Sequence, residues 1–186
     1  MTTVAPSTTD RIAAALRRLY FVRFGFAVAW AALLFVTKSD LGPATIALLV
    51  LYPLFDVGAA VVDARSARAT GPVRGLYVNV AISLLAAVGI ALAGASGVPA
   101  VLRVWGAWAI VSGLVQLIVG VGRRELGGQW PMILSGGISV LAGASFIAMA
   151  SAANSSLASI AGYATVGGIF FLVSALRLGR AAENRG

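Results

Sequence analysis

The sequence contains neither histidine nor cysteine. These absences exclude disulfide bonds, thiol nucleophiles, histidine-based acid–base catalysis and the zinc, haem and iron–sulfur sites that these residues hold. Charge is scarce as well: 11% of the 186 residues are charged, whereas a soluble domain carries about 25%. A water-soluble globular protein is therefore excluded, and no metal site or cofactor is expected.

What the sequence does have is apolar residues, which make up 60% of the chain and give a mean hydropathy of +0.95. A helix that crosses a bilayer needs about 20 mostly apolar residues. Stretches of that length lie at residues 19–37, 42–62, 74–95, 99–121, 130–150 and 156–177. The predicted fold class is all-α: a polytopic membrane protein with six transmembrane helices.

The beginning of the chain resembles a signal peptide, because Arg17 and Arg18 precede an apolar run. However, the run from Leu19 to Thr37 is longer than a typical signal core and carries Arg23, so we interpret it as a retained first span. Residues 1–18 are expected to form a separate cytoplasmic amphipathic segment on the membrane surface. The transmembrane domain is then 19–178, followed by a cytoplasmic tail at 179–186.

The net charge of +8 follows from where the basic residues lie. With the N-terminus inside, the outer segments hold only Lys38 and Arg103. The inner segments hold Arg11, Arg17, Arg18, Arg65, Arg68, Arg74, Arg123, Arg124, Arg177, Arg180 and Arg185. This bias predicts a multi-pass protein of the cytoplasmic membrane with both termini cytoplasmic. It explains the charge without nucleic acid, and it favours anionic lipid headgroups as partners.

An internal repeat is suggested by a spacing near 55 residues. Tyr52, Trp108 and Tyr163 occupy matching places in the even-numbered spans, and a basic cluster ends each of these spans. The repeat predicts three tandem helical hairpins, at approximately 19–65, 74–124 and 129–178, in parallel orientation. The alternative is that interfacial aromatic residues and cytoplasmic arginines recur in any membrane bundle.

Small residues recur at helical spacing and predict close helix packing. They are Ala109, Gly113, Ser139, Gly143, Ala164 and Gly168. Rows of this kind let helix backbones approach where lipid supplies no hydrophobic driving force. They could also form a homo-oligomer interface, but packing inside the bundle is the favoured interpretation.

Several segments carry a resemblance to a known family. They are RRELGGQW at 123–130, LSGGISVLAG at 134–143, AGYA at 161–164 and ALRL at 175–178. Together with GAWAI at 106–110, they resemble the HdeD family over roughly residues 74–180. The resemblance implies a bacterial inner-membrane protein of short tandem repeats, linked to acid resistance and the stress response. It brings no catalytic residues, since these motifs are packing signals.

Five polar side chains, each from a different span, are predicted to share one layer of the inner half of the membrane. They are Arg23, Asp56, Asn79, Gln116 and Ser135. Arg23 lies roughly 7 Å from the cytoplasmic end of its span, and Asp56 and Gln116 lie roughly 10–12 Å from theirs. Ionisable residues at membrane depth are costly, so each requires a partner and suggests a function.

Three interpretations of this layer remain open. In the first, Arg23 pairs with Asp56 and the other polar groups complete a structural network. In the second, Asp56 is a titratable group in a cavity that protons or a solute reach, as in a small transporter or channel. In the third, some of these groups face lipid headgroups or a partner, and Arg23 extends to the cytoplasm. A water-filled cavity at Asp56 would favour the second interpretation, and a dry centre the first.

No catalytic residues are predicted. The acids at membrane depth are Asp56 and, at the edge, Asp63, and no nucleophile–base pair or metal set accompanies them. Pro53 predicts a kink that would free a backbone carbonyl near Asp56. The expected function is a non-enzymatic membrane protein of the HdeD type, and the alternative is a small transporter or channel using Arg23 and Asp56.

Overall fold

The structure is a computed structural model that describes residues 8–67, 73–126, 129–153 and 155–183. Within these ranges it contains six long helices and one short 3-10 helix. The helices are α1 (Thr8–Thr37), α2 (Pro43–Ala67), α3 (Arg74–Gly94), α4 (Val98–Gly122), η1 (Arg124–Leu126), α5 (Trp130–Met149) and α6 (Ala158–Glu183). Each of the six long helices is long and apolar enough to cross a membrane. The predicted class, an all-α protein with six spanning helices, is confirmed.

Proline and glycine mark where helices begin. Helix α2 starts at Pro43, and Pro99 and Pro131 lie in the first turns of α4 and α5. Proline is favoured there because its missing N–H would have no partner within the helix. Gly97, just before α4, has a φ of +90°, a conformation that glycine adopts without steric cost. This turn joins α3 to α4 in three residues, so the two helices lie antiparallel.

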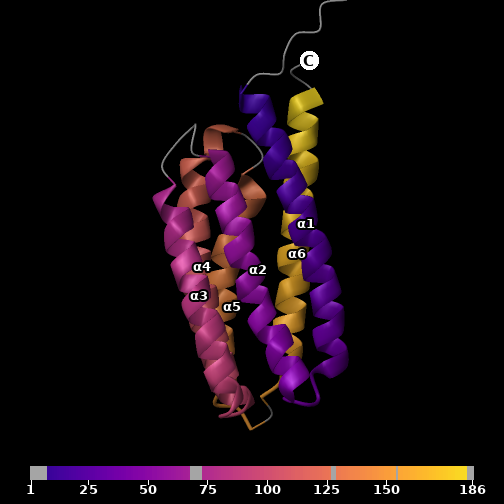
Figure 1. Ribbon diagram of the computed structural model, residues 1–186, viewed down its shortest axis with the longest axis vertical. Helices are drawn as coiled ribbons and strands as arrows, with labels where there is room; N and C mark the ends of the chain where they lie inside the picture. The colour runs from indigo at the N-terminus through magenta and orange to yellow at the C-terminus, as the bar shows by residue number, and fades with distance from the viewer. Residues whose placement is uncertain (1–7, 68–72, 127–128, 154, 184–186) are drawn as a thin grey trace, which may run out of the picture.

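The six long helices lie side by side along the long axis of the bundle (Figure 1), and their contacts close it into a ring. Each helix packs against the next one along the chain, and α6 packs back against α1. Helix α1 begins and α6 ends at the same end of the bundle, which we call the terminal end. Helix α2 ends and α3 begins at this same end, and α4 ends and α5 begins there too. The central axis of the ring is therefore enclosed by side chains from all six helices.

The six interfaces of the ring differ in extent. The α4/α5, α1/α6 and α2/α3 interfaces are the most extensive, and the α1/α2 and α5/α6 interfaces the least. The bundle thus consists of an α1/α6 pair and an α2–α5 group, which meet along two thin seams (Figure 1). Each of the three most extensive interfaces lies between two different predicted hairpins, although the threefold repeat itself stays a prediction.

The first and last helices run beyond the predicted spans. Residues 8–18 are helical and continue directly into the first span as part of α1, and their place on the membrane surface stays a prediction. Leu16 and Tyr20 explain the continuation, because both are buried against α6, where the Tyr20 ring lies 5.9 Å from that of Phe171. Helix α6 likewise runs to Glu183, so the expected tail at 179–186 is helical up to that residue. Residues 1–7 and 184–186 lie outside the described ranges.

Helices α4 and α5 touch backbone to backbone. A Cβ atom at Gly113 would lie 2.7 Å from the Cβ of Ser139 and 2.8 Å from the carbonyl oxygen of Gly136. A Cβ atom at Gly143 would lie 2.5 Å from the carbonyl oxygen of Gly106. Gly113, Ser139 and Gly143 thus lie in a contact inside the bundle, and the sequence did not single out their partners Gly106 and Gly136.

The remaining predicted packing residues also face the interior. A Cβ atom at Gly168 on α6 would lie 3.2 Å from the Cβ of Ala27 on α1. Ala109 and Ala164 are fully buried. All six small residues singled out from the sequence are therefore placed at contacts within this single chain.

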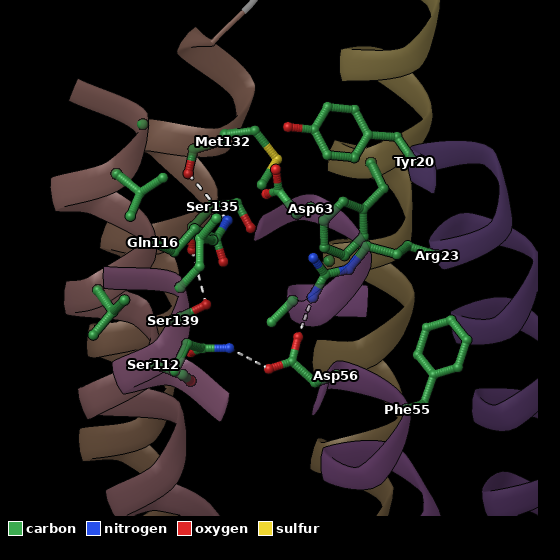
Figure 2. Close-up of a pocket in the computed structure, with 18 of the residues that line it drawn as sticks. Tyr20, Arg23, Phe55, Asp56, Asp63, Ser112, Gln116, Met132, Ser135 and Ser139 are labelled. Carbon is green, nitrogen blue, oxygen red and sulfur yellow. Dashed lines mark hydrogen bonds and ion pairs between the residues drawn. The ribbon is translucent and has the colours of Figure 1, made fainter. Parts of the chain in front are cut away.

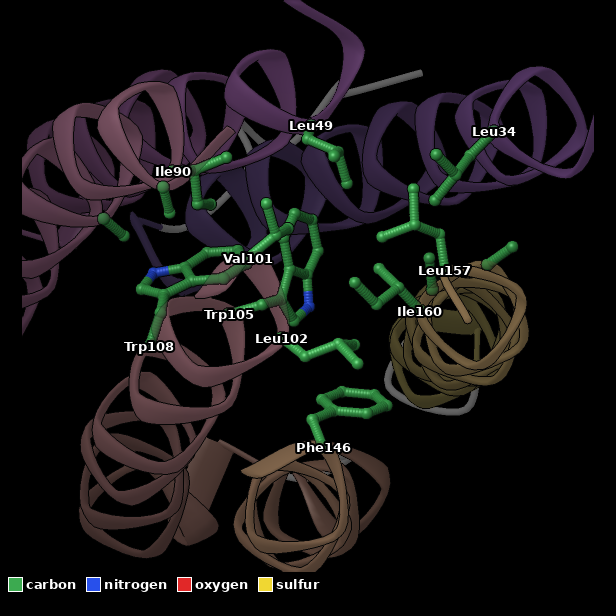
Figure 3. Packing of buried hydrophobic residues seen from close by; sticks show 14 of the residues in the cluster. Leu34, Leu49, Ile90, Val101, Leu102, Trp105, Trp108, Phe146, Leu157 and Ile160 are labelled. Atoms are coloured by element: carbon green, nitrogen blue, oxygen red, sulfur yellow. The ribbon is translucent and has the colours of Figure 1, made fainter. Parts of the chain in front are cut away.

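The half of the bundle away from the terminal end is filled by apolar side chains, which we call the apolar plug (Figure 3). Its fully buried members are Leu34, Leu49, Ile90, Val101, Leu102, Trp105, Leu157, Ile160 and Ala164. The Trp105 ring stacks on Trp30 at 5.5 Å and meets Trp108 edge-on at 5.2 Å. Trp30, Trp105 and Trp108 are thus packing residues, whereas Trp130 is largely exposed.

Candidate functional site

The other half of the bundle, between the apolar plug and the terminal end, contains a cavity (Figure 2). Its volume is about 100 Å³. A single water needs roughly 10–15 Å³ of such space, so several waters fit. All six long helices supply lining residues, from Trp108 and Tyr163 beside the plug to Arg123 and Gln129 at the terminal end.

Asp56 on α2 is the centre of a hydrogen-bond network in the wall of this cavity. Arg23 on α1 donates to one carboxylate oxygen of Asp56. The other oxygen accepts from the Asn79 amide at 2.6 Å and from the Ser83 hydroxyl at 2.9 Å, both on α3. The Trp108 indole on α4 then donates to Ser83 at 3.0 Å. We call these five residues the Asp56 network; it joins four helices and occupies both carboxylate oxygens.

The Arg23–Asp56 pair is not sealed in apolar packing. The exposed fractions of the two side chains are 15% for Arg23 and 12% for Asp56, and both side chains line the cavity. On its other side, the Arg23 guanidinium lies 4.5 Å from the centre of the Phe171 ring of α6. This cation–π contact supports the charge without occupying its N–H groups.

A second ion pair lies nearer the terminal end. Nη1 of Arg123, at the end of α4, donates to both carboxylate oxygens of Asp63 on α2, at 2.9 and 3.0 Å. Asp63 follows Asp56 by seven residues, which places it on the same face of α2 and about 10 Å farther along the helix. The sequence placed Asp63 at the membrane edge, but it assigned Arg123 only to topology.

Polar contacts continue on the α5 side of the cavity. The Tyr163 hydroxyl on α6 donates to Ser139 at 2.8 Å, and Ser139 donates to the carbonyl oxygen of Ser135 at 2.9 Å. Gln116 on α4 donates to the carbonyl oxygen of Met132 at 3.1 Å. These bonds fix the side of the cavity opposite Asp56.

The structure brings the predicted polar layer together in one cavity. Arg23, Asp56, Asn79, Gln116 and Ser135 all line it. Arg23 and Asn79 donate hydrogen bonds to Asp56 directly. Gln116 and Ser135 lie in the α4/α5 wall instead, where Gln116 donates to the carbonyl oxygen of Met132 and the carbonyl oxygen of Ser135 accepts from Ser139.

Sequence reasoning missed two members of the Asp56 network. Ser83 lies four residues after Asn79, so its place on the same helical face was a usable signal. Trp108 was singled out only for its place in the repeat, and nothing in the sequence indicates that its indole N–H points to Ser83.

Polar bonds also close the two thin seams of the ring. The α1/α2 seam is crossed by the Arg23–Asp56 pair and by the Trp30 indole, which donates to the carbonyl oxygen of Leu48 at 2.6 Å. Pro53 follows Leu48 by five residues, and α2 continues through it as a single helix. The α5/α6 seam is crossed by the bond from Tyr163 to Ser139. These seams therefore depend on a few directional contacts.

The cavity presents guanidinium, carboxylate, amide and hydroxyl groups around a space of molecular size, an arrangement suited to binding a small polar solute. Both carboxylates that line it are held by arginine. A scan against protein-family models and searches of curated proteins and of solved structures find no match for this chain. The geometry of the cavity and its two ion pairs is therefore the basis for assigning a function to this six-helix membrane protein.

Proposed function

We propose that this chain is a membrane carrier for a small polar solute, with its binding site in the cavity at Arg23 and Asp56. The observation that carries the proposal is a space of about 100 Å³ that reaches Asp56 at membrane depth and is lined by all six long helices. Ionisable groups inside a membrane domain mark solute and proton pathways when they face such a cavity. An Arg23–Asp56 pair that served structure alone would need no cavity beside it and could be surrounded by packed side chains.

The apolar plug favours a carrier over an open channel. Its members Leu34, Leu102 and Trp105 are fully buried and fill the half of the bundle beyond the cavity. A solute that enters at the terminal end would meet this plug, so passage requires a change of conformation. A site near the middle of the membrane that is closed on one side is typical of one state of an alternating-access carrier.

The division of the ring supports such a change. The α1/α6 pair meets the α2–α5 group along the two thin seams, and the cavity lies between them. Carriers commonly work by rocking one group of helices against another around a fixed site. Here the Arg23–Asp56 and Tyr163–Ser139 contacts would separate and re-form as the α1/α6 pair moves.

A second candidate function is a non-enzymatic stress protein of the HdeD type in a bacterial inner membrane. The resemblance in sequence suggests it, and one observation favours it: both oxygens of Asp56 are occupied, as a structural network requires. Such a protein would act by shaping the membrane or by binding a partner, and the Asp56 network would serve only to hold the bundle together.

The two functions are separated by the substitution Asp56→Asn in liposomes. The carrier proposal expects wild-type protein to move protons or one of acetate, urea, glycerol and methylammonium, and Asp56→Asn to fold normally but lose that flux. Asp40→Asn is the matched control, because Asp40 is exposed beyond the far end of the bundle and should leave flux unchanged. No flux in the wild type, with Asp56→Asn misfolded, overturns the carrier proposal and supports the structural function.

A further inference from the structure

We infer that the cavity binds a small carboxylate anion. This inference rests on the proposed carrier function and names its class of solute. It depends on which charged hydrogen-bonding groups of the cavity are already occupied, and on the charge around its entrance.

The acidic groups of the cavity are occupied. Asp56 accepts from Arg23 through one oxygen and from Asn79 and Ser83 through the other. Asp63 accepts from Arg123 through both oxygens. A cation would find a carboxylate partner here only by displacing an arginine, which would leave a guanidinium unpaired at membrane depth at considerable cost.

The basic groups have N–H donors to spare. A guanidinium carries five N–H donors. Within the described part of the chain, Arg23 directs one nitrogen to Asp56, and Arg123 directs only Nη1 to Asp63. Figure 2 shows the Arg23 guanidinium facing the open space between Tyr20, Asp63 and Asp56. An anion can therefore accept hydrogen bonds from arginine without breaking either ion pair, and the paired oxygens of a carboxylate match the guanidinium fork.

The terminal end of the bundle is strongly basic and would attract anions to the cavity. Its exposed charged side chains in the described ranges are Arg17, Arg18, Arg65, Arg74, Arg124, Arg177 and Arg180, with Glu125 as the acid among them. A field of one sign around a low-dielectric cleft raises the local concentration of the oppositely charged solute. The cavity itself contains two arginines and two aspartates and adds no opposing net charge.

The size and lining of the cavity limit the anion. About 100 Å³ holds a solute of a few non-hydrogen atoms. The Phe26, Phe55 and Phe171 rings lie among the lining residues and offer apolar contact to a short alkyl group. A carboxylate with one or two carbons attached satisfies both requirements.

The test is calorimetric titration of the full chain in nanodiscs, in sodium HEPES, with acetate, acetamide and methylammonium. These probes have nearly the same size and differ in charge. We expect acetate to bind and the two other probes to bind at least ten-fold more weakly. Equal binding of acetamide, or equal or tighter binding of methylammonium, overturns the inference.

A pair of variants locates the site. The double variant Arg123→Gln/Asp63→Asn removes one ion pair but keeps the cavity neutral, and we expect acetate affinity to fall at least ten-fold. Arg103→Gln is the matched control, because Arg103 is exposed near the start of α4, away from the terminal end and outside the cavity lining; the acetate affinity of this variant should stay within about two-fold of wild type. Unchanged acetate affinity in the double variant, or an equal loss in Arg103→Gln, overturns the inference.

Failure of the inference differs from failure of the proposed function. If methylammonium or urea, but not acetate, shows a flux that Asp56→Asn abolishes, the carrier function stands and the carboxylate assignment is wrong. If no probe binds and none is moved, both are overturned.

Discussion

The direct backbone contact between α4 and α5 makes Gly113→Ala destabilising, although alanine is normally the better helix former. The new Cβ would lie 2.7 Å from the Cβ of Ser139 and 2.8 Å from the carbonyl oxygen of Gly136. Neither atom is the end of a flexible side chain, so neither can rotate away. Ordinary contact begins near 3.4 Å, so the two helices must part by about 0.6–0.7 Å.

The size of the effect follows from two opposing contributions. Replacing glycine by alanine inside a helix gains about 1 kcal/mol of helix propensity. Overpacking costs about 1–3 kcal/mol, and a gap of about 0.5–1 Å removes a quarter to a half of each dispersion contact along the shared face. That face includes the close approach of Gly106 to Gly143. We expect the free energy of unfolding to fall by about 1–2 kcal/mol.

The assay is reversible unfolding in mixed micelles, with Gly162→Ala as the matched control. Gly162 is an exposed α6 residue, and a Cβ there meets nothing within 4 Å. We expect this control to keep or slightly raise the free energy of unfolding. If Gly113→Ala is as stable as Gly162→Ala, the backbone contact between α4 and α5 is refuted.

Three further outcomes are expected. Asp63→Asn and Arg123→Gln should show a coupling free energy of about 1 kcal/mol in a double-mutant cycle of unfolding, a value between those of exposed and of buried ion pairs. Additive effects of the two substitutions would contradict the Arg123–Asp63 ion pair. Tyr163→Phe removes the hydroxyl that donates to Ser139 across the α5/α6 seam and should lower the free energy of unfolding by about 0.6 kcal/mol; no loss would contradict that bond. In cells, Ser66→Cys should react with an impermeant maleimide only after permeabilisation, since the positive-inside bias predicts a cytoplasmic position for residue 66; labelling of intact cells would overturn the predicted topology.

The six helices were predictable because membrane spans depend on length and apolar content, which are properties of the sequence alone. Their ends were less so. Whether residues 8–18 extend α1 depends on whether α6 covers Leu16 and Tyr20. That is a contact between residues more than 150 positions apart, and helical periodicity cannot report it.

The polar layer was predictable because helical rise converts sequence position into depth. Depth does not give rotation about the helix axis, so the sequence could not say which members touch. Asn79 contacts Asp56 across the α2/α3 interface, whereas Gln116 turns to the carbonyl oxygen of Met132. Arg123 was missed for a related reason: an arginine at a helix end is explained by topology, and its pairing with Asp63 depends on how α2 and α4 are placed around the ring.

The presence of a cavity could not be predicted at all. It lies between the Arg23–Asp56 pair and the α4/α5 wall, in a ring closed by extensive interfaces on some sides and thin seams on others. The same composition packed with six equal interfaces could have a dry centre.

The central claim is that water-soluble molecules reach the cavity beside Asp56, and cysteine accessibility tests it most directly because the chain has no native cysteine. Ser112 lines the cavity, whereas Ser174 is fully buried and its hydroxyl has no hydrogen-bond partner among the described residues. Single Ser112→Cys and Ser174→Cys variants in proteoliposomes would be treated with a small charged methanethiosulfonate. We predict that Ser112→Cys is modified from the side of the terminal end and that Ser174→Cys is not. Failure to modify Ser112→Cys from either side, or equal modification of both variants, would contradict a solute-accessible site at Asp56.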